Sequence, residues 1–427
     1  MPRPPAPDAL SIPAPVRDRR VTDAPRRRAG VALALLGALI ANPLHAQLPD
    51  PEWHIPAVAT STAPSHPEYK ALAAALLIEQ EKARAAEPPP VEAGPLLRVG
   101  MRDARVAQLR DRLRHSGDYT PEMGADPWYF DAGIDAALRR LQARHVLVPD
   151  GQLGERTLAA VNRSAASRAD QIEVALERWR WLPRDLAGDY IWVNIPRAQL
   201  DLVEDGVTTL SMRVVVGHRE RSTPSLSGQL NRVTFNPTWS VPARIAVEDL
   251  LPRQRENPEF LATNGFRVLA AGGRALAPRS IDWSGIDASR FPYRLVQAPG
   301  PTNSLGRIRL SFYNPYDIYL HDTPSRGLFS LMTRLLSSGC VRLEDAARLT
   351  TALIARERPW TAGDTEAATA ASATRNINLR VGLPVYLVYI TTWIESGELR
   401  FGHDLYGRDP PVLAALRDTA AMADQKP

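Results

Sequence analysis

Apolar residues recur every three or four positions through most of the first half of the chain, which is the spacing of amphipathic helices. This spacing predicts one helix over residues 69–84 and another over 165–181, each ended by proline. Between them, the same spacing predicts three short helices within residues 97–162. The chain ahead of the β-rich half is therefore expected to be all-α, with a short proline-rich linker at 88–94.

In the second half of the chain the apolar pattern changes from helix-like to strand-like. The pattern predicts a mainly β domain over 188–405, followed by a loose polar tail at 406–427. Strands are predicted at 190–195, 199–203, 210–216, 233–239, 381–393 and 399–401. Two segments interrupt the domain: an insert at about 244–305, with a helix at 247–255, and a second helix shortly after residue 340.

Residues 26–46 have the order of a secretory signal peptide: three arginines, an apolar run, and small residues ahead of a cleavage point after Ala46. The apolar run is too short for an easy transmembrane span, and an uncleaved anchor is the alternative. Residues 47–66, rich in proline, serine and threonine, are predicted to be an extended tether. The sequence thus predicts an exported, soluble protein and leaves the export route open.

The charge balance argues against nucleic-acid binding. The chain has 52 Lys and Arg against 47 Asp and Glu, and residues 1–46 hold seven of the former and three of the latter. Without that segment the net charge is +1, which gives no cluster of cations for a phosphate backbone. The 44% hydrophobic and 23% charged residues are otherwise ordinary for a globular protein of two or three domains.

Cys340 is the only cysteine in 427 residues, so no disulfide can form within the chain. A lone cysteine is often a small buried apolar side chain, but the Ser-Ser-Gly run ahead of this one is not typical of a core. Leucines at helical spacing between residues 328 and 336 predict a helix that brings His321 and Cys340 together. The imidazole can then take the thiol proton and leave a nucleophilic thiolate. A helix N-terminus just beyond Cys340 is expected to lower the thiol pKa.

Two segments resemble the active-site signature of the L,D-transpeptidases, the YkuD-type cysteine enzymes of the bacterial cell wall. These are Tyr319-Leu320-His321-Asp322-Thr323-Pro324 and Ser337-Ser338-Gly339-Cys340-Val341-Arg342. The larger, YcbB-like branch of the family is also similar at Val216-Gly217, Phe235-Asn236-Pro237-Thr238-Trp239 and Asn314-Pro315-Tyr316. Many YkuD-type proteins have His ahead of the motif glycine, where this chain has Ser338. Residues 97–162 resemble the three-helix peptidoglycan-binding module, most clearly at Asp150-Gly151-Gln152-Leu153-Gly154.

The resemblance implies a multidomain fold: a YkuD-type β-sandwich with helices and an inserted lid, plus a small all-α module. It also implies that Cys340 attacks the carbonyl of the third residue of a stem tetrapeptide, releases the terminal D-Ala and leaves a thioester. His321 would act as general base and then as general acid. A side-chain amine of another stem, as acceptor, would give a 3→3 cross-link.

Further residue roles follow from the same resemblance. The backbone carbonyl of Ser337 is expected to orient the imidazole. The oxyanion hole is assigned to the backbone N–H groups of Ser338, Gly339 and Cys340. The candidate substrate-binding residues are Arg342, Tyr319, Trp239 and Asp322. The guanidinium of Arg342 could bind a substrate carboxylate through two hydrogen bonds. The alternative is that Arg342 forms a structural salt bridge under the loop.

The predicted organisation is a signal peptide (1–46), a tether and scaffold helix (47–96), the module (97–165), a connecting helix (166–187), the catalytic domain (188–405) with its insert, and the tail (406–427). The insert is predicted to be a lid over the site, or else a subdomain far from it. Expected partners are peptidoglycan stem peptides, as tetrapeptide donor and amine acceptor, with other cell-wall enzymes, in the periplasm. No cofactor or metal is expected, because His321, Asp322 and Cys340 lack the paired spacing of zinc ligands. The alternatives are an L,D-carboxypeptidase, another cysteine peptidase, or a non-catalytic wall-binding protein.

Overall fold

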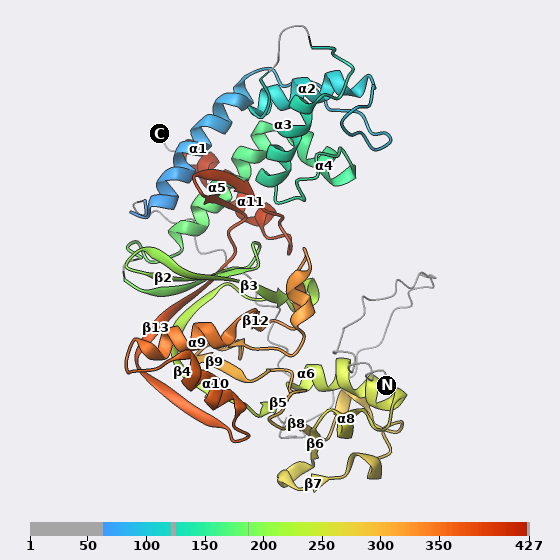
Figure 1. Cartoon of the computed structure of the whole chain (residues 1–427), viewed down its shortest axis with the longest axis vertical. Coiled ribbons are helices and arrows are strands. Elements are labelled where there is room, and N and C mark those ends of the chain that lie inside the picture. The colour runs from blue at the N-terminus through green and yellow to red at the C-terminus, as the bar shows by residue number, and fades with distance from the viewer. Residues whose placement is uncertain (1–62, 121–124, 187, 425–427) are drawn as a thin grey trace, which may run out of the picture. The chain divides into compact units, whose positions relative to one another are not determined.

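The computed structural model describes residues 63–120, 125–186 and 188–424 (Figure 1). The predicted signal peptide at 1–46, and residues 47–62 of the predicted tether, lie outside this range. Within it, no helix combines the length and the apolar character that crossing a membrane requires.

Helices α1 (Pro67–Arg84) and α5 (Ala165–Arg180) pack against each other and confirm the two long helices predicted early in the chain. His66 begins α1 by accepting a hydrogen bond from a backbone N–H, and its ring stacks on Trp179 with 4.5 Å between centroids. Strand residues from the far end of the chain complete the core under the two helices. That core includes Leu72, Ile172, Ala175, Trp179, Val388, Ile390 and Phe401.

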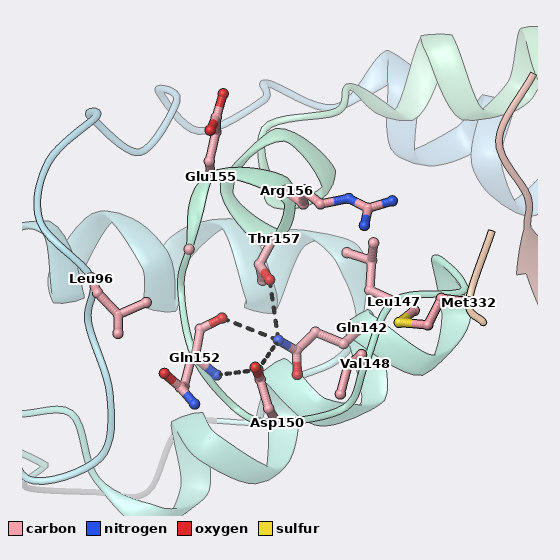
Figure 2. Close-up of a pocket in the computed structure, with 11 residues that line it drawn as sticks. Leu96, Gln142, Leu147, Val148, Asp150, Gln152, Glu155, Arg156, Thr157 and Met332 are labelled. Carbon is pink, nitrogen blue, oxygen red and sulfur yellow. Dashed lines mark hydrogen bonds between the residues drawn. The ribbon is translucent and has the colours of Figure 1, made fainter. Parts of the chain in front are cut away.

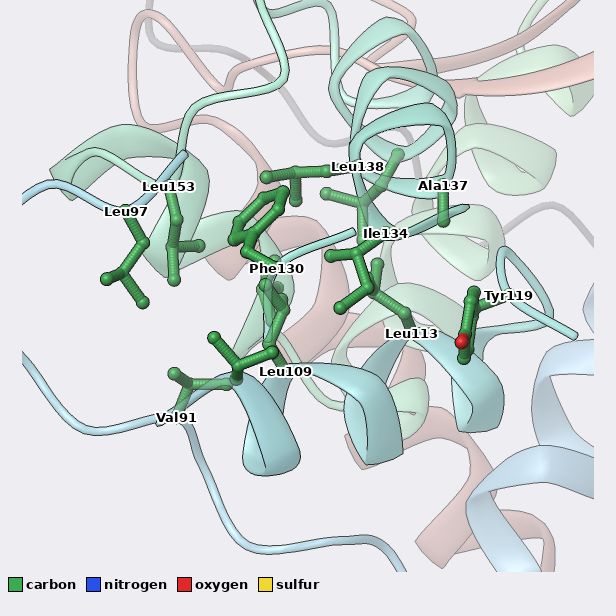
Figure 3. Packing of buried hydrophobic residues seen from close by; sticks show 13 residues of the cluster. Val91, Leu97, Leu109, Leu113, Tyr119, Phe130, Ile134, Ala137, Leu138 and Leu153 are labelled. Atoms are coloured by element: carbon green, nitrogen blue, oxygen red, sulfur yellow. The ribbon is translucent and has the colours of Figure 1, made fainter. Parts of the chain in front are cut away.

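Three helices form the all-α module, as predicted: α2 (Arg105–Ser116), α3 (Ala132–Arg144) and α4 (Glu155–Val161). Asp131 caps α3 by accepting the Ile134 N–H, and Gly117 ends α2 in the left-handed conformation, with φ of 86°. Figure 3 shows how apolar side chains of α2, α3 and the flanking loops meet in one core. Its buried members include Leu97, Leu109, Leu113, Phe130, Ile134, Leu138 and Leu153.

Nine strands of the β domain form one sheet. They are β1 (Tyr190–Asn194), β2 (Gln199–Glu204), β3 (Val207–Gly217), β4 (Leu226–Phe235), β9 (Ile308–Phe312), β10 (Leu320–His321), β11 (Leu335–Ser337), β12 (Val341–Leu343) and β13 (Arg375–Val388). Their order is β11-β3-β12-β10-β9-β4-β13-β1-β2, and β2 also pairs with β3, so the sheet closes on itself through β3. This confirms the predicted mainly β domain.

The hairpin predicted near the end of the domain is also present. β14 (Thr392–Glu395) and β15 (Glu398–Phe401) are antiparallel and joined by a two-residue turn. Ser396 and Gly397 both have positive φ, 51° and 79°, as tight hairpins require. Helices α9 (Ala346–Ala355) and α10 (Ala362–Ala370) lie between β12 and β13 in the chain.

The predicted insert is a small subdomain with a four-stranded sheet of its own, in yellow and olive in Figure 1. Its strands are β5 (Trp239–Ser240), β6 (Phe266–Leu269), β7 (Ala275–Leu276) and β8 (Arg294–Gln297). Its helices are α6 (Ala243–Ile245), the π-helical turn η2 (Ala246–Leu250), α7 (Leu251–Glu256) and α8 (Phe260–Thr263). The helix predicted at 247–255 is confirmed, with a π-turn inside it that local periodicity does not reveal.

The helix predicted between residues 328 and 336 is wrong. A short 3₁₀ turn, η6 (Arg326–Ser330), is followed by extended chain and then by β11. Leu331 and Met332 are 45% and 57% exposed, and Leu335 pairs with Val216 of β3. The backbone of this segment bonds to a strand about 120 residues earlier, and that long-range pairing overrides a short local pattern.

The prediction of a loose tail is also wrong. Residues 409–424 form helix α11 (Asp409–Asp424). Asp409 accepts a hydrogen bond at 2.5 Å from the buried guanidinium of Arg178 on α5. Arg417 of α11 forms an exposed ion pair with Asp170 of α5, with 2.9 Å between the two groups. Pro410 and Pro411 stand in the first turn of α11, where missing N–H groups cost nothing.

Candidate active site

Strand pairing places the predicted site residues on one face of the sheet. β10 runs parallel to β12, with His321 directly opposite Arg342, and the Val341 N–H donates to the Tyr319 carbonyl at 3.1 Å. Side chains alternate between faces along a strand, so the residues two positions before His321 and Arg342 share their face. Those residues are Tyr319 and Cys340, so residues separated by about 20 positions meet.

The Cys340 thiol is half-buried beside Tyr319. Its sulfur lies 3.8 Å from the carbonyl oxygen of Asp317, and it also contacts both the side chain and the backbone of Tyr319. In the described part of the chain, no hydrogen bond joins this thiol to His321. Catalytic hydrogen bonds often tighten only when substrate is bound, so the shared face remains the relevant geometry.

Burial sets the protonation of both groups. It raises the pKa of the Cys340 thiol to about 11, although Tyr319 and Arg342 act in the opposite direction. Burial also lowers the pKa of His321 to about 3, and the positive charge of Arg342 adds to that shift. Near neutral pH the pair is therefore a thiol and a neutral imidazole, not a thiolate and an imidazolium.

The predicted helix N-terminus beside Cys340 is wrong. Strand β12 follows the cysteine, and α9 begins only at Ala346, with Asp345 capping it through the Arg348 N–H. A helix dipole acts mainly within its own first turn, so it does not reach the thiol. The helix itself was predicted, and its Leu349 and Leu353 are buried.

Alkylation of Cys340 by iodoacetamide is expected to accelerate about tenfold per pH unit between pH 7 and 9, because the thiolate fraction rises that way below the thiol pKa. His321 is neutral throughout this range, since its pKa is about 3, and a neutral imidazole does not stabilise a thiolate by charge. Stopped-flow or mass-spectrometric rates across pH 5–10 measure the profile. A preformed thiolate–imidazolium pair would instead give a plateau above about pH 6, which would contradict this assignment.

A neighbouring backbone carbonyl orients the imidazole. His321 Nδ1 lies 2.6 Å from the carbonyl oxygen of Asp322, and the backbone of Leu305 also hydrogen-bonds the ring. A carbonyl oxygen can only accept, so we assign the proton to Nδ1, which leaves Nε2 as the basic nitrogen. The predicted partner, the carbonyl of Ser337, is wrong. That oxygen accepts the His218 N–H at 2.9 Å, because β11 pairs with the end of β3.

Asp322 has a structural role, and its contact with substrate stays a prediction. One carboxylate oxygen accepts the Arg307 backbone N–H at 2.7 Å, and the other accepts the Arg326 guanidinium at 2.6 Å. The side chain is buried, and a Cβ at Gly306 would come within 2.3 Å of it. Asp322 therefore fixes the turn that follows the imidazole.

Residues 337–340 form a tight loop, called here the nucleophile loop. Gly339 has φ of 112°, which side chains disfavour. Its N–H donates to the Ser337 hydroxyl at 3.2 Å, and that hydroxyl donates to the Cys340 carbonyl at 2.6 Å. The Gly339 carbonyl accepts the Thr223 hydroxyl at 2.7 Å. Because the Gly339 N–H is already engaged, only the N–H groups of Ser338 and Cys340 stay as predicted oxyanion donors.

Comparison with known families separates the two parts of this fold. The YkuD family, described as "L,D-transpeptidase catalytic domain", matches residues 188–358, which contain β10, the nucleophile loop and β12. Residues 188–358 are thus similar to the YkuD L,D-transpeptidase catalytic domain. A second family, described as "Putative peptidoglycan binding domain", matches residues 102–161, the region of α2 to α4.

Individual proteins are also similar to parts of this chain. A protein of Haemophilus influenzae named "Putative L,D-transpeptidase" is 40% identical over 225 residues, which are 53% of this chain and 45% of the relative. The chain thus matches about half the length of that relative. Among solved structures, L,D-transpeptidase (Yku) from Stackebrandtia nassauensis is 13% identical, with a TM-score of 0.24, over 73% of this chain and 99% of that one. L,D-transpeptidase 3 from Mycobacterium tuberculosis is 14% identical, with a TM-score of 0.23, over 47% and 60%.

Within the matched region at 188–358, Ser338 connects the nucleophile loop to the insert. Arg221, in the 3₁₀ turn η1 (Arg219–Arg221), donates to the Ser338 hydroxyl at 2.9 Å. The same guanidinium pairs with Asp249 at 2.6 Å and with Glu248 at 2.5 Å, and both carboxylates lie on η2. Sequence reasoning missed Arg221, because its partners are 27 to 117 positions away.

A second layer of support comes from residues beyond the matched L,D-transpeptidase domain. The Tyr406 hydroxyl donates to the Gly217 carbonyl at 2.7 Å and accepts the Thr223 N–H at 3.3 Å. Arg408 donates to the Thr223 carbonyl at 3.3 Å and to the Ser222 hydroxyl at 2.9 Å. Thr223 in turn holds the nucleophile loop, so the segment predicted to be loose supports the active site. No local sequence signal marks this role.

The other candidate site residues are Trp239, Tyr319 and Arg342. Trp239, on β5, is buried, and its ring packs at a tilt against Phe266 of the insert. It also hydrogen-bonds with Tyr319, so this buried side chain connects the insert to the site. Tyr319 lies between this tryptophan and the thiol, and its substrate contact stays a prediction. Among the residues described, no carboxylate pairs with Arg342, so the alternative of a structural salt bridge is wrong.

The matched peptidoglycan-binding region has a cavity of about 280 Å³ beside the start of α4 (Figure 2). Gln142 is buried at its base, where the side-chain amide donates to the Asp150 carboxylate at 2.8 Å and to the Thr157 hydroxyl at 3.1 Å. Met332, from the segment between His321 and Cys340, also lines the cavity. The chain that joins the two catalytic candidates therefore reaches this second site.

Proposed function

We propose that this chain is an L,D-transpeptidase that forms 3→3 cross-links in peptidoglycan through a thioester on Cys340. The observation that carries the proposal is the pairing of β10 with β12, which sets His321, Tyr319 and Arg342 around the single cysteine. The family match over 188–358 and the Haemophilus influenzae relative support the reaction class.

The proposed reaction begins as His321 Nε2 takes the thiol proton while Cys340 sulfur bonds to the carbonyl carbon of the third stem residue. The backbone N–H groups of Ser338 and Cys340 are the proposed donors to the oxyanion. The bond to the terminal D-Ala then breaks, and His321 returns the proton to the departing amine. An acceptor amine attacks the thioester, forms the cross-link and restores the thiol.

Disaccharide-tetrapeptides incubated with the mature protein test this function. The expected products are free D-Ala and a cross-linked dimer of disaccharide-peptides, separated by liquid chromatography and identified by mass spectrometry. Cys340→Ala is expected to give neither product. Tripeptide without any dimer would favour an L,D-carboxypeptidase instead, and no turnover together with retained glycan binding would favour a wall-binding protein.

The same proposal assigns a place and a role to the rest of the chain. Residues 1–46 are proposed to be an export signal, which would put the mature protein in the periplasm where stem peptides occur. The cavity around Gln142 is the proposed contact of the module with peptidoglycan, supported by the match at 102–161. Other cell-wall enzymes are proposed partners, since some enzyme must supply the tetrapeptide.

A further inference from the structure

Two arginines flank the catalytic imidazole. His321 lies directly opposite Arg342 on β12 and directly opposite Arg309 on β9. Residues opposite one another on neighbouring strands project from the same face, and the strands lie about 4.8 Å apart. Arg309, His321 and Arg342 therefore form a row across three strands. Both positive charges act on the imidazole, as their lowering of its pKa indicates.

Neither arginine of this row has an acidic partner in the described part of the chain. The Nε atoms of Arg309 and Arg342 are both buried without a hydrogen-bond acceptor. By contrast, the buried Arg168 pairs with Glu79 at 2.7 Å, and Arg178 pairs with Asp409 at 2.5 Å. Both side chains are partly buried, and a partly desolvated guanidinium without a counter-charge is unfavourable, so the pair of arginines is prepared for an anion from outside.

Tyr319 helps to fix the direction of Arg309. The guanidinium carbon of Arg309 lies over the Tyr319 ring, 5.5 Å from its centroid, and the same ring packs edge-on against His321 at 5.8 Å. A guanidinium stacked by one face keeps its N–H edge available, and that edge matches a carboxylate in two parallel hydrogen bonds. The arrangement orders the side chain without neutralising it.

We propose that Arg309, together with Arg342, binds the free carboxylate of the terminal residue of the donor stem. This inference rests on the proposed function. His321 returns its proton to the amine of the departing residue, and the carboxylate of that residue is attached to the carbon that bears this nitrogen. The carboxylate must therefore lie within a few bond lengths of the imidazole, where the two guanidiniums stand.

Such a subsite explains how the enzyme would select its donor. A stem with one residue beyond the scissile bond places its carboxylate between the arginines, whereas a longer stem would place an uncharged peptide bond there. The bound negative charge would also offset the two positive charges beside His321 during proton transfer. Arg309 is thus a specificity residue, and only Arg342 was a candidate from the sequence.

Two matched donors test the subsite: a disaccharide-tetrapeptide with a free terminal carboxylate, and the same compound as the terminal carboxamide. Arg309→Gln is expected to lower kcat/KM for the carboxylate donor by about tenfold to a hundredfold, the value of a charge-assisted pair. The carboxamide donor is expected to lose much less, so discrimination collapses. Arg309→Lys should retain part of the preference for the carboxylate donor over the carboxamide donor. Arg232→Gln, an exposed arginine on β4, is the control.

Alkylation of Cys340 tests the subsite without turnover. The ratio of the rate constants for anionic iodoacetate and neutral iodoacetamide is expected to exceed that of a cysteine peptide, and Arg309→Gln is expected to lower it about tenfold. Comparing ratios cancels any change in the thiol itself. A ratio equal to that of the peptide, and unchanged by Arg309→Gln, would overturn the subsite even if cross-linking occurs. A raised, Arg309-dependent ratio without any cross-linking would overturn the proposed function and keep the subsite.

Discussion

Gly339→Ala is expected to slow acylation of Cys340 by a carbapenem about a hundredfold, a typical result of misplacing a reacting group by about 1 Å. Gly339 has φ of 112°, where a side chain costs of order 1–3 kcal/mol, and an added Cβ would lie 3.2 Å from Ile318. The nucleophile loop can relieve the backbone strain and the contact with Ile318 only by rotating the peptide group next to Cys340. Intact-protein mass spectrometry follows the adduct over time.

Gly327→Ala is the matched control, because it lies on the same connection between His321 and Cys340 and its added Cβ would meet nothing within 4 Å. Its acylation rate and melting temperature should match those of the wild type. Gly339→Ala should still give a cooperative melt, since the change is local. Wild-type acylation by Gly339→Ala would mean that the loop conformation is not what positions the thiol.

Removing the chain from residue 404 onward is expected to lower the melting temperature by about 10 °C or more and to abolish acylation of Cys340. The deletion takes Asp409 away from the buried guanidinium of Arg178, and breaking a buried ion pair typically costs about 3–5 kcal/mol. It also removes the Tyr406 and Arg408 hydrogen bonds to the segment at 217–223 that holds the nucleophile loop. Circular dichroism melting and carbapenem adduct formation measure the two effects.

Arg417→Ala tests whether the deletion acts through these specific contacts. Arg417 lies on the same helix, but its ion pair with Asp170 is exposed, and such pairs contribute about 0–1 kcal/mol. This variant should melt within about 2 °C of the wild type and acylate normally. A truncated protein that keeps both wild-type stability and acylation would show that the segment is dispensable.

Elements with strong local patterns could be predicted from the sequence. The helices α1, α2, α3 and α5 follow from apolar spacing closed by caps or prolines, and the turn at Ser396 and Gly397 follows from a polar pair between two apolar runs. The failures are segments whose partners are distant. Leu335 belongs to a strand because it pairs with β3. Helix α11 is held by the hydrogen bond between Asp409 and Arg178, and Arg408 just before the helix donates to the Thr223 carbonyl.

The same division applies to the site. The residue types of Cys340 and His321 could be inferred from the motif. The helix predicted to bring them together is wrong, and the pairing of β10 with β12 places them on one face instead. The thiol pKa could not, because its direction depends on whether a strand or a helix follows the cysteine and on how deeply the sulfur is buried. Arg309 could not be found either, since nothing near it in sequence marks it, and only the register of β9 against β10 places it beside the base.

The Arg221 bridge limits how this protein can be divided into exchangeable parts. The insert begins near residue 243, yet the guanidinium that binds its first helical run comes from residue 221 and also touches the residue next to the motif glycine. A chimera that takes the insert from another enzyme must therefore carry a compatible residue at 221 and at 338. An insert cut at its apparent boundaries would leave two carboxylates, Glu248 and Asp249, without the cation that they share.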